Sequence, residues 1–314
     1  MLTIHLDKEL PDTEADKFAG QWATEDLYDT LIEEDATVYK PNGEPLLIFR
    51  KNIIPVELCK KAWANIRDAG TVTNARGVAG GEIKESEAAK YHAIKTGENR
   101  MQQVRARDGK LSKRTRGNPV NSGIIGYMDK NAVFPYCRTT AYNLKKPEKF
   151  QQAIPFIKQV NNVFKELHPE RYNKQEAMIK KTHPDFYIED TAFTTVTVNR
   201  NFRTAIHKDK GDYEEGFGVM TAFTTGNFTG YNLVFPKYRV AVNMQTTDVA
   251  LCDVHEWHGN TAAYSLESGN EKAPGTYERI SCVFYYRSKM ADCGSEQEEL
   301  LAAQKREDKK LDEF

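Results

Sequence analysis

The sequence lacks the features of a membrane protein or a secreted protein. No apolar run approaches the roughly 18 residues that a membrane helix needs. The first residues are acidic, so we expect no secretory signal, no transit peptide and no membrane partner. The five cysteines stand at positions 59, 137, 252, 282 and 293 without a Cys-x-x-Cys pair. A disulfide framework or a cysteine-type zinc site is therefore not expected, and the sequence predicts a soluble protein of a reducing intracellular compartment.

A phosphate-binding glycine loop is also absent. The Gly-rich segment at residues 73–81, TNARGVAGG, lacks the strand and helix that flank a dinucleotide fingerprint or a Walker motif. There are no internal repeats and no low-complexity tract. The chain does have apolar material, with 39% hydrophobic residues that include 15 Phe and 15 Tyr among 314 positions. That content supports a sizeable core and excludes global disorder.

The net charge of −1 conceals an uneven distribution. Residues 1–35 carry 11 acidic and 2 basic side chains, and residues 291–314 carry 8 and 4, which leaves 38 basic and 26 acidic side chains between them. The densest basic stretch, residues 100–116, holds seven Lys or Arg and one acid. A basic body can attract a polyanion. Charge alone favours a simpler interpretation, a solvated mobile loop, because Gly109, Gly117 and Pro119 flank the stretch.

Hydrophobic periodicity divides the chain into regions. Residues 1–45 are expected to form an acidic arm with one short helical piece near residues 25–33, and residues 291–314 a charged helix over 296–310. Between them, apolar spacing predicts a strand at 46–50 and helices at 56–68 and 147–167. From Phe193 the period becomes two, with short strands at 195–199, 219–223, 233–235, 239–242, 249–253 and 280–286. This pattern indicates an α+β protein in which a helical and loop part, 46–190, precedes a β-sandwich or jelly roll, 191–290.

One group of residues in this β-rich part has the spacing of a metal site. His207 and Asp209 are two apart after a predicted strand, so an extended backbone presents both side chains on one side. A second imidazole stands 48 or 51 residues later, at His255 or His258. Two His and one carboxylate on one face, with open positions opposite, form the triad of non-haem Fe(II) oxygenases. Strand alternation lets either later histidine reach the metal in a different register.

Arg279 strengthens this interpretation. It begins a predicted strand about 20 residues after the second imidazole, where a buried guanidinium can hold a carboxylate through two hydrogen bonds. The distal carboxylate of 2-oxoglutarate requires such a partner. The simpler alternative is an ion pair at the strand end between Arg279 and Glu278.

Several motifs together resemble the TET/JBP family of dioxygenases. The resemblance is clear over residues 190–290, and residues 70–165 look more like the JBP-type and phage or microbial members than like animal TET proteins, whose large Cys-rich zinc region is absent. The motifs are residues 194–203, His207-Lys-Asp209-Lys-Gly-Asp212, 217–220, 230–236, His258-Gly-Asn-Thr261 and Glu278-Arg-Ile-Ser281. This chain departs from the family by an insertion at 262–276 and by Tyr231-Asn232, where many members have a small pair.

The resemblance implies a double-stranded β-helix and assigns roles to the site. His207, Asp209 and His258 would bind Fe(II), with His258 preferred over His255 because the family's second histidine precedes an Arg-Ile-Ser strand. 2-Oxoglutarate would chelate the iron and contact Arg279, and O₂ would take the last position. Asn199, Arg200 and Arg203 lie just before the ligands, where the co-substrate, a phosphate or ordinary packing are equally good interpretations.

The resemblance also implies hydroxylation of the 5-methyl group of thymine or 5-methylcytosine in DNA, on a base flipped out of the duplex. Such an enzyme would work in the cytoplasm of a bacterial or phage-infected cell, or in a eukaryotic nucleus. The candidates for base recognition are Asn74, Arg76, Tyr127 and Arg138. The candidates for DNA-backbone contacts lie in the loop expected at 100–118 and are Arg105, Arg107, Lys113, Arg114 and Arg116.

Two other functions are compatible with the sequence. The same triad and Arg279 would serve a 2-oxoglutarate-dependent hydroxylase of a free nucleotide, a protein side chain or a small metabolite, because fold and metal do not fix the substrate. A non-catalytic DNA-binding module with a decayed site is disfavoured, because the triad and Arg279 are intact.

Overall fold

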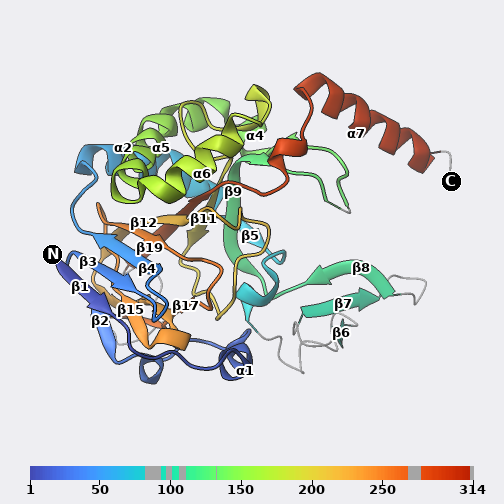
Figure 1. The fold of residues 1–314 in the computed structure, drawn as a ribbon. Helices are drawn as coiled ribbons and strands as arrows, with labels where there is room; N and C mark the ends of the chain where they lie inside the picture. The colour runs from blue at the N-terminus through green and yellow to red at the C-terminus, as the bar shows by residue number, and fades with distance from the viewer. Residues whose placement is uncertain (82–92, 97–100, 106–110, 132, 268–276, 312–314) are drawn as a thin grey trace.

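The computed structural model describes residues 1–81, 93–96, 101–105, 111–131, 133–267 and 277–311. Its centre is a ten-stranded sheet in the order β1-β3-β4-β16-β12-β19-β11-β9-β10, with β5 paired to β9. A four-stranded sheet, β17-β14-β15-β2, faces it. Two smaller sheets are formed by β13-β18 and by β6-β7-β8. Figure 1 shows α2, α4, α5 and α6 gathered on the outer face of the large sheet, whereas α1 lies on the opposite side of the molecule and α7 extends away from it.

The elements have the following bounds. The strands are β1 Leu2–His5, β2 Thr30–Ile32, β3 Ala36–Tyr39, β4 Pro45–Arg50, β5 Val72–Thr73, β6 Ala93–Thr96, β7 Met101–Arg105, β8 Leu111–Arg116, β9 Val120–Met128, β10 Arg138–Thr139, β11 Thr195–Arg200, β12 Gly218–Gly226, β13 Phe228–Gly230, β14 Leu233–Phe235, β15 Val240–Val242, β16 Val249–Cys252, β17 Gly259–Asn260, β18 Ala263–Ser265 and β19 Tyr277–Tyr285. The α-helices are α1 Asp12–Ala15, α2 Val56–Ile66, α4 Ala141–Lys145, α5 Pro147–Leu167, α6 Pro169–Ile179 and α7 Glu296–Leu311.

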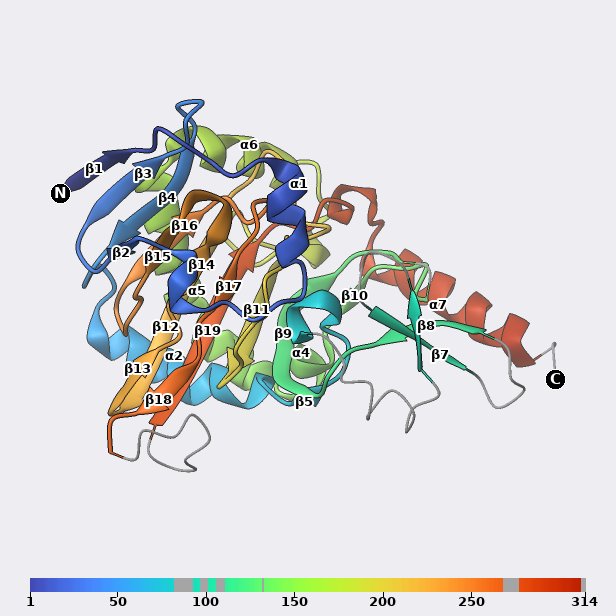
Figure 2. The ribbon, with the colours of Figure 1, turned by 90° about the horizontal axis from the view of Figure 1, so that it is seen from below.

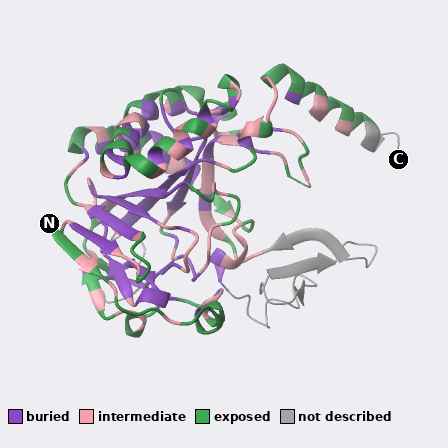
Figure 3. Cartoon of the chain, viewed as in Figure 1, coloured by how far each residue is buried: buried purple, intermediate pink, exposed green. Residues whose placement is uncertain are grey.

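Strand alternation separates two cores on the two faces of the large sheet. On β19, Ile280, Cys282 and Phe284 point toward the helices, where Phe284 and Phe223 pack against Phe156 of α5. The intervening residues of β19 point toward the smaller sheet and contribute to the second core. Figure 3 shows the buried strands between these layers. The protein is therefore a jelly roll with helices on one outer face, in agreement with the expected α+β class.

The strongly periodic segments were predicted correctly. The helix expected at 147–167 is α5, the helix at 56–68 is α2, and every strand expected from 195 onward exists with shifts of a few residues at its ends. The charged helix near the C-terminus is α7. Within the described ranges, no helix is both long enough and apolar enough to span a membrane.

The expected N-terminal arm is wrong. Residues 1–45 supply β1 and β3 to the large sheet and β2 to the small one, where β2 pairs in parallel with β15. The helical piece expected near 25–33 is a 3₁₀ turn, Glu25–Leu27, followed by β2. These strands have only three or four residues, too few to show a period, and their partners lie far along the chain.

Two further expectations need correction. The basic stretch is not a plain loop, because β7 and β8 pair with each other in an antiparallel sheet with β6 (Figure 1). Arg105 lies on β7, the other described candidates for DNA-backbone contact lie on β8, and Arg107 falls outside the described residues. Cys137 and Cys293 form a disulfide across 156 positions. Nothing in the spacing of the five cysteines indicates that these two pair.

Candidate metal centre

A short antiparallel contact between two distant segments creates the site. His207 follows β11 and His258 immediately precedes β17. The backbone N–H of His207 donates to the carbonyl of His258 at 2.8 Å, and the reverse bond is 2.9 Å long. The two residues are therefore a cross-strand pair whose imidazole centroids lie 4.4 Å apart. This is the register in which both side chains point to the same side.

Gly259 makes this close approach possible. A Cβ atom at this position would lie 2.9 Å from the amide nitrogen of Ile206 and 3.0 Å from the carbonyl carbon of Ala205. No side chain fits between the two segments without moving one of them. The glycine that follows His258 thus has a packing role in bringing the second imidazole to the first.

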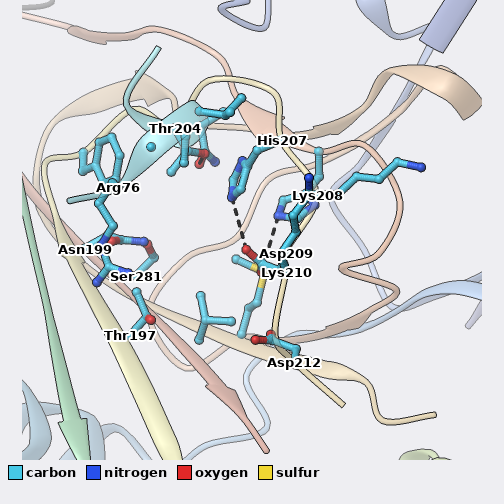
Figure 4. A pocket seen from close by; sticks show the side chains of 18 of the residues that line it. Arg76, Thr197, Asn199, Thr204, His207, Lys208, Asp209, Lys210, Asp212 and Ser281 are labelled. Atoms are coloured by element: carbon cyan, nitrogen blue, oxygen red, sulfur yellow. Dashed lines mark hydrogen bonds and ion pairs between the residues drawn. The ribbon is translucent and has the colours of Figure 1, made fainter. Parts of the chain in front are cut away.

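The two imidazoles are held in the orientation that a metal requires. His207 Nδ1 lies 2.8 Å from the carbonyl oxygen of Ala205, and His258 Nδ1 lies 2.9 Å from that of Glu256. A proton on each Nδ1 satisfies these contacts and leaves Nε2 with a free lone pair. Both Nε2 atoms face Asp209, at 3.4 Å and 3.9 Å from its carboxylate oxygens (Figure 4).

The three groups fit one divalent ion. One ligand atom from each of His207, Asp209 and His258 lies within 4.8 Å of the others. Burial raises the pKa of Asp209, but the hydrogen bond and charge of His207 outweigh it and lower the pKa to about 2. Burial lowers the pKa of His258 to about 4. At His207, burial lowers the pKa, but the hydrogen bond and charge of Asp209 outweigh it and raise the pKa. The carboxylate and the His258 imidazole therefore already have the protonation state of metal ligands, and His207 would release a proton when a metal binds.

His255 is turned away from this group. Its Nδ1 lies 3.4 Å from Asp253, whose carboxylate also binds Lys40 at 2.9 Å. The hydrogen bond from His255 to Asp253 raises the pKa of the imidazole. The structure therefore brings His258, and not His255, together with His207 and Asp209.

Arg279 is a buried cation without a carboxylate partner in the described part of the chain. Its side chain is 3% exposed, and burial lowers its pKa to about 10. The guanidinium lies 5.3 Å from the centroid of the Tyr231 ring. The alternative ion pair with Glu278 is wrong. The Glu278 carboxylate accepts instead from Arg67 at 2.9 Å and Arg200 at 2.6 Å. A buried, uncompensated guanidinium is suited to bind a carboxylate of a small molecule.

A cavity of about 590 Å³ opens beside the triad. Its polar lining comes from several strands and from the Gly-rich segment at 73–81, which supplies Arg76 (Figure 4). On β19 the side chains at every second position face inward, so Ser281, Val283 and Tyr285 line the cavity and Arg279 lies on the same side of the strand. The polar lining residues are Arg76, Thr197, Asn199, Thr204, Lys208, Lys210, Asp212, Asn260, Ser281, Tyr285 and Arg287.

Only part of the expected recognition set reaches this cavity. Of the four residues expected to recognise the base, Arg76 lines the cavity, whereas Asn74, Tyr127 and Arg138 are not among its described lining residues. Asn199, expected near the co-substrate, also lines the cavity. Tyr127 packs edge-on against Phe186 on the helical side of the sheet. The guanidinium of Arg138 stacks on Phe134 and donates to a carbonyl oxygen. Tyr127 and Arg138 lie on β9 and β10, and the local sequence does not show which face of a strand a side chain occupies.

The side chain of Arg203, a candidate for co-substrate binding, contacts the N-terminal segment. Its guanidinium donates to the carbonyl oxygens of Ala23 at 2.7 Å and Asn260 at 3.3 Å, and lies 5.1 Å from the Trp22 ring. These contacts fasten the N-terminal segment to the strand behind the metal ligands. They explain the residue without a co-substrate contact.

Sequence reasoning missed Asp212 as a site residue. It lines the cavity three positions after Asp209, and burial together with the charge of Asp209 raises its pKa. The available signal was the motif His207-Lys-Asp209-Lys-Gly-Asp212, which contains a second carboxylate.

Two imidazoles and one carboxylate inside a jelly roll, with a buried arginine on the face of β19 that lines the cavity, define the class of 2-oxoglutarate- and Fe(II)-dependent oxygenases. The Tet_JBP family model, described as the oxygenase domain of the 2OGFeDO superfamily, matches residues 123–288. The chain belongs to this family.

Comparisons with individual proteins agree with this assignment. The thymine dioxygenase JBP1 of Trypanosoma brucei brucei is 38% identical over 175 residues, which are 55% of this chain and 20% of that protein. Thymine dioxygenase JBP1 of Leishmania tarentolae is 31% identical over 231 residues, 73% of this chain and 27% of that protein. The chain thus spans about a quarter of the length of these curated relatives. A structure of NgTET1 in complex with 5mC DNA shares the fold, with a TM-score of 0.54 and 13% identity over 88% of this chain and 87% of that one.

Proposed function

We propose that the protein is an Fe(II)- and 2-oxoglutarate-dependent dioxygenase that hydroxylates the 5-methyl group of a pyrimidine base in DNA. The observation that supports this most directly is the triad of His207, Asp209 and His258 at the edge of a cavity, with Arg279 buried on the same side of β19 as the residues that line it. Relatives with up to 38% identity are named thymine dioxygenases. Thymine is accordingly the first base to test, with 5-methylcytosine as the second.

The residues divide the work in a simple way. When bound, Fe(II) together with 2-oxoglutarate and O₂ supplies the oxidising power and the oxygen atom. His207, Asp209 and His258 hold the metal from one side and leave the other side open for small ligands. Arg279 offers its guanidinium to the distal carboxylate of the co-substrate.

The cavity would position the methyl group. Met220, Leu233 and Val283 form apolar parts of its wall and keep water from the reacting carbon. Arg76, Asn199 and Asp212 present donors and acceptors of the kind that read the polar edge of a base. A base in a duplex cannot reach the triad, so we propose that the target nucleotide flips into the cavity.

The basic candidates for backbone contact remain part of the proposal. Arg105 on β7 and Lys113, Arg114 and Arg116 on β8 belong to a small sheet that extends away from the two main sheets (Figure 1). We propose that these side chains bind phosphates of the DNA substrate. We also propose that the protein acts inside the cell, where DNA is present. Phosphate binding of this kind weakens steeply with salt.

The test is incubation of the full chain with thymine-containing and 5-methylcytosine-containing DNA, Fe(II), 2-oxoglutarate and O₂. We expect nucleoside mass spectrometry to detect the gain of one oxygen atom on one of the two bases. The Asp209→Ala variant should form no product, and Asp190→Asn, a change at an exposed carboxylate, should behave as wild type. Succinate formation that depends on a free nucleotide, a peptide or a small metabolite, with DNA unchanged, would favour the alternative hydroxylase.

A further inference from the structure

The guanidinium of Arg279 lies over the ring of Tyr231. The guanidinium lies 5.3 Å from the ring centroid, within the range of a cation–π interaction. Both residues are almost fully buried, Arg279 at 3% and Tyr231 at 6% exposure. In the described part of the chain no carboxylate pairs with Arg279. The π face of Tyr231 therefore compensates a cation that has no anionic partner among the described residues.

The backbone holds Tyr231 in an unusual conformation at this place. Tyr231 has a φ of +54°, and the preceding Gly230 has a φ of +96°. A Cβ at Gly230 would lie 1.9 Å from the carbonyl oxygen of Ala262, so only glycine fits there. A left-handed tyrosine is uncommon and persists only where its surroundings fix it.

The ring is fixed on its sides by two other aromatic residues. Phe228 and Tyr277 stack on each other, and both lie steeply inclined to the Tyr231 ring, with centroid distances of 6.0 Å and 6.2 Å. The Tyr231 ring is thus packed against two aromatic neighbours at steep angles, while the Arg279 guanidinium lies over it. This packing sets the position of the π surface independently of the metal centre.

A hydrogen-bonded link connects Tyr231 to the metal-binding segments. The side chain of Asn260, two residues after His258, donates to the carbonyl oxygen of Tyr231 at 3.1 Å. The same side chain accepts from the hydroxyl of Thr204 at 2.7 Å, three residues before His207. Asn260 therefore ties the backbone of Tyr231 to the segments that carry both histidines. On the other side, Asn201 accepts from the backbone N–H of Arg279 at 2.7 Å.

We propose that Tyr231 is a positioning residue, which holds the Arg279 guanidinium for the distal carboxylate of the keto-acid co-substrate and so makes the site selective for dicarboxylates. This inference rests on the co-substrate of the proposed function and is independent of the DNA substrate. Tyr231 acts through Arg279, so it should affect the binding of a ligand with a distal carboxylate and spare a ligand that only chelates the metal.

The test measures binding by isothermal titration calorimetry with Mn²⁺ as a redox-inert metal. The probes are 2-oxoglutarate and oxalate, which chelates a metal but has no distal carboxylate. Tyr231→Phe keeps the aromatic face, and we expect its 2-oxoglutarate affinity to stay within about twofold of wild type. Tyr231→Leu removes the face and should weaken 2-oxoglutarate by about 5- to 30-fold, with oxalate affinity unchanged. Tyr264→Leu, at a 40% exposed tyrosine of β18, is the matched control and should change neither affinity.

A second series separates electrostatics from packing. Phenylalanine and trifluorophenylalanine at position 231 have nearly the same shape, but fluorine withdraws charge from the ring face. We expect the affinity for 2-oxoglutarate to fall with fluorination while the thermal midpoint stays constant. This series also tests the inference if Tyr231→Leu does not fold.

Two results would overturn the inference. One is unchanged 2-oxoglutarate affinity in Tyr231→Leu or across the fluorinated series. The other is an equal loss of 2-oxoglutarate and oxalate in a folded variant, which would assign Tyr231 to the metal centre or to the core. Because these measurements contain no DNA, absence of a modified base would refute the proposed substrate and leave this inference standing.

Discussion

At the residue scale, the metal centre depends on the hydrogen bonds behind its ligands. The carbonyl oxygens of Ala205 and Glu256 accept from the Nδ1 atoms of the two histidines. These bonds fix the imidazole rings, so that Nε2 and not Nδ1 faces Asp209. Asp209 supplies the single negative charge among the three ligands. The affinity for a divalent ion should therefore depend most strongly on this carboxylate.

Replacing Asp209 by Asn tests this dependence with almost no change in volume. We expect the affinity for Fe(II), titrated without oxygen, to fall by about 100-fold, because an amide retains an oxygen ligand but removes the charge. The thermal midpoint of the metal-free protein should change little in comparison. Asp190→Asn, remote from the site, is the control. Equal metal affinity in Asp209→Asn and wild type would show that the ion binds elsewhere.

The sequence predicted which candidate metal ligands the fold brings together, but only one of the four candidates for base recognition lines the cavity. His207, Asp209, His258 and Arg279 follow from a chemical pattern whose spacing along strands is fixed by geometry. Base recognition has no such spacing rule. Tyr127 packs toward the helices instead of the cavity, and only the folded register of β9 shows this.

At the element scale, α7 is anchored to the body through its first turn, and Arg306 further along lies 5.3 Å from the centroid of the Phe134 ring. The disulfide of Cys137 and Cys293 lies just before the helix, and the buried carboxylate of Glu299 accepts from the backbone N–H groups of Cys137 and Gly294, both at 2.8 Å. Lys130 adds an ion pair to Glu299 at 2.9 Å. The later turns extend away from the sheets (Figure 1).

Reduction of this disulfide should loosen the start of α7. We expect a dithiol reductant to lower the free energy of unfolding by about 2–4 kcal/mol, because the bridge closes a long loop, and to speed amide exchange at residues 296–300. The Cys293→Ser variant should show the lower stability without reductant and no further change with it. Identical thermal midpoints for the wild type with and without reductant would mean that the thiols are not paired in solution.

The elements that were predicted incorrectly share a physical cause. Helix α5 has 21 residues and a strong apolar face, so its period is visible in isolation. Strands β2 and β3 are short, and their pairing with β15 and β4 depends on partners that the local sequence does not reveal. The pairing of Cys137 with Cys293 is likewise a property of the folded chain.

At the scale of the whole molecule, the N-terminal region packs against the segments that carry the candidate metal ligands. Gly20 donates to the carbonyl of Ile206 and Ile206 donates to that of Gln21, each at 2.8 Å, directly beside the first metal ligand. Asp16 accepts from the indole of Trp257 at 2.9 Å, beside the last ligand. Figure 2 shows this N-terminal segment passing across the small sheet. The family match, residues 123–288, contains the ligands but none of these contacts.

Removal of residues 1–28 should therefore impair the metal centre. We expect metal affinity to drop by about tenfold or more, because the segments that present His207 and His258 lose their outer support. Removal of residues 1–8 takes away only the edge strand β1 and the few residues that flank it. It should leave the metal affinity close to that of the full chain. Similar affinities for both truncated proteins would show that the inner strands alone fix the ligands.

The pairing of β4 with β16 has a consequence for how the protein is made. β4 ends at Arg50 and its partner strand begins at Val249, so about two hundred residues must leave the ribosome before the large sheet can close. Until then the early strands have no neighbour on that side and expose unpaired backbone groups. Nascent chains of this protein should thus need protection by chaperones during most of their synthesis, and slow translation should increase aggregation.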